Sequence, residues 1–195
     1  MKTDVIVISS EGSNMEAALA QIEKVTAYKE LSEKDALSLR LLTEEMMAMM
    51  RAITGNVNGE FWVEDRDNIY ELHLRVNSLI DEKRREQLLS ASTSGKNEAS
   101  RGFMGRIRSF FEPSSSVPVF NAGFMGGGAP QMYGNYAWSM EDYRDQLRQY
   151  REQNQASHQE EWDELEKSVV AKIADDVKVS IRGRVVEMTI TKRIG

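Results

Sequence analysis

The residues of this 195-residue chain that could carry out chemistry are few. Glu44 and Glu45 are adjacent acids, either of which could act as a general base, and His73 and His158 could transfer protons near neutral pH. The chain contains no cysteine, which excludes thiolate nucleophiles, thiolate metal sites and disulfides. Two histidines are too few for a multi-histidine metal site, so we expect no metal centre.

A basic, glycine-containing stretch is a candidate phosphate-binding loop. Lys96 and Arg101 come shortly before Gly102 and Gly105, and residues 102–111 could form a short amphipathic helix. Backbone N–H groups at the start of a helix point toward an anion, and nearby cationic side chains add to the attraction. The stretch therefore predicts where a phosphate would bind if the chain takes a nucleotide.

The same types of residue also have plain structural interpretations. Adjacent acids on a helix point about 100° apart, so at least one of the two glutamates is expected in solvent. His73 is out of phase with the apolar residues of its expected strand, which predicts an exposed side chain, and His158 lies in the most polar part of the chain. Basic residues between 83 and 108 are interspersed with acids, which favours a salt-bridged surface over contact with nucleic acid.

The composition is typical of a soluble globular domain, with 41% hydrophobic and 29% charged residues. Lys and Arg number 25 against 31 Asp and Glu, and the net charge of −6 argues against nucleic acid or anionic lipid as a partner of the whole surface. No apolar run approaches the roughly twenty residues of a transmembrane helix, and the N-terminal residues do not form a signal peptide. We therefore expect a cytoplasmic protein.

Hydrophobic periodicity predicts the elements that would position these residues. Residues 4–9 form a β-branched strand that we expect to be buried on both faces. Two helices are expected next. The first is capped by Ser13 or Asn14, and the second begins at Ser32 and is stopped by Gly55.

Two segments alternate between apolar and polar residues and predict β-hairpins. The first covers residues 61–76 with a turn at 65–68, and the second covers residues 177–190 with a turn at 182–183. Such alternation is typical of antiparallel strands that bury one face. A short charged helix is expected at 81–89.

Between the hairpins the composition changes. Residues 91–138 contain all three prolines and most of the thirteen glycines, which predicts a long irregular insertion that could act as a lid or docking arm. Ser139 is expected to cap the helix that follows. The order of elements predicts one α/β two-layer sandwich over residues 1–195, with a mixed, mostly antiparallel sheet and helices on one face.

This order of elements resembles the histidine-kinase-like ATPase (GHKL) family, and within it the stand-alone serine kinases of the anti-sigma-factor type. The first motif of the family is a Glu followed four residues later by an Asn that binds Mg²⁺. Glu45 matches the acid, which the resemblance implies would act as the base that activates water or a substrate hydroxyl. Met49 stands where the Asn would be, and a thioether is a poor ligand for Mg²⁺. We therefore expect no Mg²⁺ at this position.

Two further motifs of the family contact the nucleotide. The second, Asp-x-Gly-x-Gly after the first hairpin, recognises adenine. Here both glycines are missing, and Asn77 is left as a group that could hydrogen-bond the base. The third is a glycine-rich phosphate loop, which the stretch with Lys96, Arg101, Gly102 and Gly105 resembles. The resemblance thus implies ATP or ADP as the ligand of these residues.

Three functions stay open on this resemblance. We favour a regulatory module that lacks ATP hydrolysis, binds another protein such as a sigma-factor-like regulator, and could form a homodimer and retain ATP or ADP. The second function is an active serine kinase with Glu45 as base and Lys96, Arg101, Gly102 and Gly105 on the phosphates. The third is a structural interaction protein without a ligand. Substitution of Lys96 and Gly102 separates them, because the nucleotide-binding functions alone predict a loss of ligand stabilisation.

Overall fold

The computed structural model describes residues 1–9, 15–54, 58–77, 135–152, 162–163, 165–166, 168–182 and 185–195. Several predictions fall outside these residues. They are the cap at Ser13 or Asn14, the stop at Gly55, the helices at 81–89 and 102–111, His158, most of the insertion, and the phosphate-binding candidates Lys96, Arg101, Gly102 and Gly105.

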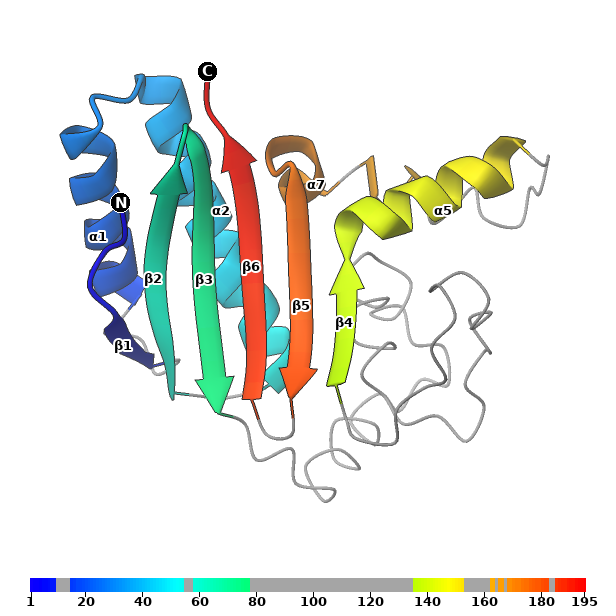
Figure 1. Cartoon of the computed structure of the whole chain (residues 1–195), viewed down its shortest axis with the longest axis horizontal. Helices are drawn as coiled ribbons and strands as arrows, with labels where there is room; N and C mark the ends of the chain where they lie inside the picture. The colour runs from blue at the N-terminus through cyan, green and yellow to red at the C-terminus, as the bar shows by residue number, and fades with distance from the viewer. Residues whose placement is uncertain are drawn as a thin grey trace.

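An antiparallel sheet of six strands forms the centre of the described structure (Figure 1). Its strands lie in the order β1-β2-β3-β6-β5-β4, and each neighbouring pair is antiparallel. The bounds are β1 Ile6–Ser9, β2 Asn58–Arg66, β3 Ile69–Asn77, β4 Asn135–Ser139, β5 Asp176–Arg182 and β6 Val185–Arg193. Both predicted hairpins, β2–β3 and β5–β6, are confirmed, and β3 pairs with β6 to join them.

The described helices lie on one side of this sheet or beyond its edge. Their bounds are α1 Met15–Tyr28, α2 Glu33–Thr54, α5 Met140–Glu152 and α7 Val169–Ile173. In Figure 1, α2 lies behind the sheet, α1 lies beside it at the β1 edge, and α5 continues from the end of β4 and points away from it. The side of the sheet that faces the viewer carries no described helix, and we call it the open face. The predicted two-layer α/β sandwich, with a mostly antiparallel sheet and helices on one face, is confirmed.

The hydrophobic core lies between the sheet and the helices, at the positions that the periodicity predicts. In Tyr70–Val76 every second residue of β3 is at most 2% exposed, while the residues between them point to the open face. On α2, Leu39, Leu42 and Met46 recur at helical spacing and are fully buried. Each of these side chains contributes about 2 kcal/mol of hydrophobic stabilisation, which holds α2 against the sheet.

The tight turn between β2 and β3 sets the register of the first hairpin. Asp67 and Asn68 have φ angles of 50° and 64°, in the left-handed region that a two-residue hairpin turn of type I′ requires. Asp and Asn adopt this region more readily than other non-glycine residues. The predicted turn at 65–68 is confirmed, although the strands extend further into it than expected. In this register Glu64 of β2 lies opposite Glu71 of β3.

Strand β1 differs from its prediction. It is an outer strand that pairs with β2, and Val5 and Val7 are 50% and 68% exposed, so the segment is not buried on both faces. Ile8 points to the core and is 6% exposed. A run of β-branched residues is typical of a strand covered on both sides. At the edge of a sheet that has helices on one face, however, alternate side chains point into solvent.

Strand β4 is an element that the sequence does not predict, because residues 135–138 fall inside the expected insertion at 91–138. It pairs with β5 along its whole length. Five residues that follow a glycine-rich stretch carry too little alternation to be recognised as a strand, and the pairing with β5 stabilises them in the sheet. The irregular insertion therefore does not extend to residue 138.

Two of the described helices begin as the sequence predicts. The Oγ of Ser32 accepts a hydrogen bond from the Asp35 N–H at 3.2 Å and donates one to the Asp35 carboxylate at 2.6 Å. The Oγ of Ser139 accepts a hydrogen bond from the Asp142 N–H at 3.2 Å at the start of α5. Among the helices that the structure describes, none is both long and apolar enough to cross a lipid bilayer.

Candidate functional site

Two of the sequence-predicted site residues, Glu45 and Asn77, are described. Glu45 lies on α2 with its side chain half-buried, and Asn77 is exposed at the last position of β3. No described hydrogen bond or ion pair joins them. Met49, at the position that the resemblance assigns to a Mg²⁺ ligand, is 3% exposed and belongs to the hydrophobic core. The four phosphate-binding candidates stay sequence predictions.

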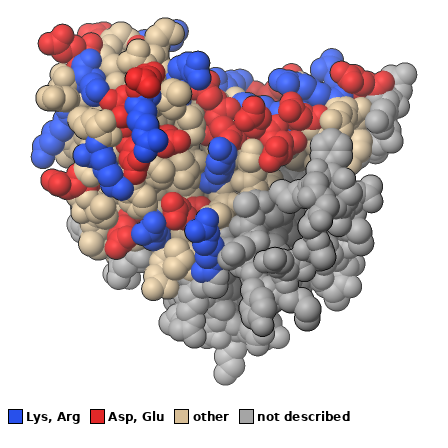
Figure 2. Space-filling model, in the orientation of Figure 1, with Lys and Arg blue, Asp and Glu red and all other residues tan. Residues whose placement is uncertain are grey.

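The open face of the sheet carries a group of polar and charged side chains. Figure 2 shows this side of the molecule, where positive and negative side chains lie next to one another over the sheet. The guanidinium of Arg75 on β3, for example, is 3.8 Å from Glu60 of β2 and 3.3 Å from Glu187 of β6. Such half-exposed ion pairs each stabilise the fold by less than about 1 kcal/mol. Their arrangement keeps charges of both signs mixed over this surface.

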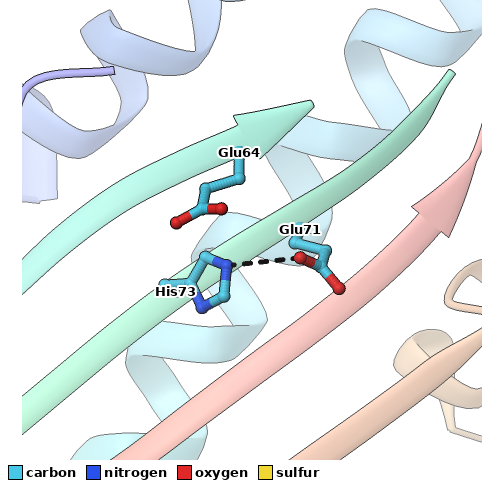
Figure 3. A group of neighbouring side chains, drawn as sticks. All are labelled: Glu64, Glu71 and His73. Carbon is cyan, nitrogen blue, oxygen red and sulfur yellow. Dashed lines mark ion pairs between the residues drawn. The ribbon is translucent and has the colours of Figure 1, made fainter. Parts of the chain in front are cut away.

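Glu64, Glu71 and His73 form a compact group on the open face (Figure 3). Glu71 and His73 are two positions apart on β3 and therefore share a face, and the hairpin register brings Glu64 of β2 beside them. One nitrogen or oxygen atom of each side chain lies within 4.8 Å of the others. The His73 Nε2 is 3.7 Å from the Oε2 of Glu71. We call these three residues the Glu-Glu-His cluster.

The imidazole of His73 is held by residues of both neighbouring strands. Trp62 of β2, its direct partner in the strand pairing, stacks on it with ring centroids 4.8 Å apart and planes inclined by 3°. Thr189 of β6 places its Oγ1 3.2 Å from Nδ1. The side chain is 12% exposed, so the prediction of an exposed histidine is wrong, because the indole covers one face of the ring. Nε2 is buried and has no hydrogen-bond partner among the described residues.

Burial controls the protonation of His73. Loss of solvation lowers the pKa of the imidazole below its ordinary value of 6.5. The carboxylates of Glu64, Glu71 and Glu187 act in the opposite direction, because they attract the charged form, but burial outweighs them. The ring is therefore neutral near pH 7, with nitrogen lone-pair capacity beside two carboxylates.

Glu64 is ionised more readily than an ordinary glutamate. Hydrogen bonds from Lys2 Nζ and Trp62 Nε1, each 3.0 Å long, hold the pKa of its carboxyl below the usual 4.5. Both donors use Oε1, and the guanidinium of Arg66 is 3.9 Å from Oε2. Together, a neutral imidazole and adjacent carboxylates are suited to accept a proton or a cation.

The candidates that the sequence suggests do not include Glu64 or Trp62, and the pattern of its strand predicts an exposed His73. A signal was available within the hairpin, because a two-residue turn after Arg66 places Glu64 opposite Glu71 by simple counting. The contact between His73 and Thr189 has no such signal, since 116 residues separate them. The part of the cluster that comes from β2 and β3 could therefore be predicted, and the contribution of β6 could not.

The depressed pKa of His73 predicts a pH dependence of folding stability. The unfolded chain binds a proton at this residue more tightly than the folded chain, so its contribution to stability is present above pH 6.5 and is lost as pH falls through that value toward the folded pKa. We expect urea unfolding in EDTA buffer to show a lower free energy of unfolding at about pH 5.5 than at about pH 7.5. In His73→Gln this decrease should be smaller. An equal decrease in both proteins would contradict the prediction.

A comparison with protein-family models and a search of the curated proteins found no match to this chain. The two groups of candidate residues are therefore interpreted from their geometry. The Glu-Glu-His cluster lies on the open face of the sheet, while Glu45 and Met49 are on α2 behind it.

Proposed function

We propose that this chain is a regulatory module with a histidine-kinase-like ATPase fold, which does not hydrolyse ATP and acts by binding another protein. The observation that carries the proposal is the burial of Met49, which is 3% exposed and part of the hydrophobic core. Mg²⁺ requires oxygen ligands, and a thioether in an apolar environment supplies none. Phosphoryl transfer depends on this ion to neutralise the phosphates, so its loss argues against the kinase alternative.

The order of the described elements supports the choice of fold family. A strand, two helices and a hairpin come first, and after a long intervening segment the chain continues with helices and a second hairpin. This is the order on which the resemblance rests, apart from the additional strand β4. Glu45, the residue that matches the acid of the first motif, lies on the second of the two helices, as the resemblance implies.

The edge strand β1 supports protein binding as the mode of action. It is the outer strand of the sheet next to β2. Val7 within it and Val5 just before it are 68% and 50% exposed. Exposed apolar side chains that lie together on one face of a protein are typical of surfaces that contact another protein. This surface lies on the chain's own sheet and needs no nucleotide for its formation.

The proposal predicts that Mg²⁺ does not change the response of the protein to nucleotide. Thermal unfolding of the full chain would be measured with millimolar ATP or ADP, with Mg²⁺ or with EDTA. A ligand at one hundred times its dissociation constant adds about 2.7 kcal/mol of stability, which is easily measured. We expect the unfolding temperature at each nucleotide concentration to be the same with and without Mg²⁺, because Met49 replaces the metal ligand.

A stabilisation that requires Mg²⁺ would contradict the proposal and favour an active kinase. A stabilisation by nucleotide that is independent of Mg²⁺, and that is lost in Lys96→Ala and Gly102→Ala, would indicate a regulatory module that responds to nucleotide. Absence of any stabilisation would favour a module that binds proteins without a nucleotide. The variants would be compared with the parent chain without ligand, so that changes in intrinsic stability are separated from changes in binding.

A further inference from the structure

We propose that the Glu-Glu-His cluster binds one divalent transition-metal ion of the zinc class on the open face of the sheet. One atom each of Glu64, Glu71 and His73 lies within 4.8 Å of the others, and all three side chains converge in Figure 3. The site lies on the face of the sheet opposite to Glu45 and Met49, and it does not depend on the nucleotide-binding residues.

The hydrogen bonding of His73 prepares the imidazole to act as a ligand. Its Nδ1 lies 3.2 Å from the Thr189 hydroxyl, while Nε2 is buried without a hydrogen-bond partner among the described residues. In metal sites, a hydrogen bond at one ring nitrogen fixes the tautomer and the orientation that let the other nitrogen coordinate. A buried polar atom without a partner is uncommon in folded proteins, and a bound cation would satisfy it. The stack on Trp62 holds the ring in this position.

The distances require small movements of flexible side chains. Zinc binds nitrogen and oxygen at about 2.0–2.2 Å, so two of its ligands in tetrahedral geometry lie about 3.5 Å apart. The 3.7 Å between His73 Nε2 and Glu71 Oε2 is already close to this value. Glu64 must approach by roughly 1 Å, which rotation of its side chain can provide. Its Oε1 is engaged by Lys2 and Trp62, so Oε2 is the oxygen that would turn to the metal and away from Arg66.

The types of ligand decide which ions fit. Mg²⁺ and Ca²⁺ prefer sites built from oxygen alone, whereas a site with one imidazole and two carboxylates suits Zn²⁺, Co²⁺ and related ions. Three protein ligands on a sheet face that carries no described helix leave a fourth position of a tetrahedral ion for water. We therefore expect Zn²⁺ and Co²⁺ to bind, and Mg²⁺ at the same concentration not to bind.

Calorimetric titration of the full chain with zinc chloride, after treatment with a chelator and buffer exchange, tests the proposal. We expect one Zn²⁺ per chain, with an affinity at least tenfold weaker in Glu71→Gln and in His73→Gln. The positioning role of the threonine predicts a loss of about tenfold in Thr189→Val. Glu60→Gln is the matched control, because this carboxylate lies on the same face but outside the cluster and is not among the charges that act on His73, so the zinc affinity of this variant should equal that of the parent chain.

Titration with Co²⁺ gives a second readout, since the visible absorption of the bound ion reports its ligands. Absence of zinc binding at zinc concentrations up to about 100 μM would overturn the proposal, because three well-placed ligands should give a dissociation constant below this concentration. Binding that His158→Gln removes and His73→Gln does not would also overturn it. Unfolding temperatures in EDTA show whether each variant folds. If His73→Gln does not fold, the zinc affinity of Glu71→Gln tests the proposal. The Glu71 side chain is 41% exposed, and glutamine has nearly the same shape.

Discussion

Replacing Met49 with asparagine is expected to lower the free energy of unfolding by about 3 kcal/mol. The side chain is 3% exposed in the core, where the change removes apolar packing and introduces an amide without water to solvate it. The same substitution restores the residue type that the histidine-kinase-like motif has at this position. The variant therefore distinguishes a position that faces a nucleotide pocket from one that lies in the core. Urea unfolding measures its free energy of unfolding.

The neighbouring substitution Ala48→Asn is the matched control for Met49→Asn. Ala48 is exposed on the same helix. Ala48→Asn is therefore expected to lose a similar amount of helix propensity, about 0.5 kcal/mol, without disturbing the core. We also expect Met49→Asn to gain no Mg²⁺-dependent stabilisation by ATP. A Met49→Asn protein that is as stable as the Ala48→Asn protein and is stabilised by ATP only with Mg²⁺ would show that a functional pocket lies at this position, and would contradict our proposal.

Replacing Trp62 with alanine is expected to destabilise the protein by roughly 3 kcal/mol and to raise the pKa of His73 toward its ordinary value. The indole is 5% exposed although it lies on the open face, because the His73 ring, Lys2 and Arg75 cover it. Its removal exposes the imidazole to water and takes away the desolvation that depresses the pKa of His73. The pKa would be followed by NMR titration of the imidazole protons.

Trp62→Phe separates the two contributions of the indole. Phenylalanine keeps an aromatic ring for the stack but loses the Nε1–H that donates to Glu64. We expect the pKa of His73 to stay depressed in this variant and the loss of stability to be smaller than in Trp62→Ala. If the pKa of His73 were the same in the parent chain, Trp62→Ala and Trp62→Phe, the stacked indole would not be the cause of the depressed pKa.

Local patterns in the sequence determined most of the architecture. Alternation of apolar and polar residues identified both hairpins, and helical spacing identified α1 and α2, because burial of one face imposes these periods on any amphipathic element. Ser32 and Ser139 marked the starts of helices through hydrogen bonds made within one turn. The candidates Glu45 and Asn77 could be placed on their elements in the same way, whereas a joint role for them stays a prediction.

Other features were decided by the tertiary structure alone. The sequence shows that residues 6–9 form a strand, but only the sheet order makes β1 an edge with Val7 in solvent. Strand β4 exists through its pairing with β5, which no local pattern encodes. His73 lies next to Thr189 because β3 pairs with β6 across 116 residues, and this contact, with the stacked Trp62, buries an imidazole that its strand alone would expose. Periodicity reports which face a side chain occupies, whereas the neighbours that set its chemistry come from strands that the chain brings together on folding.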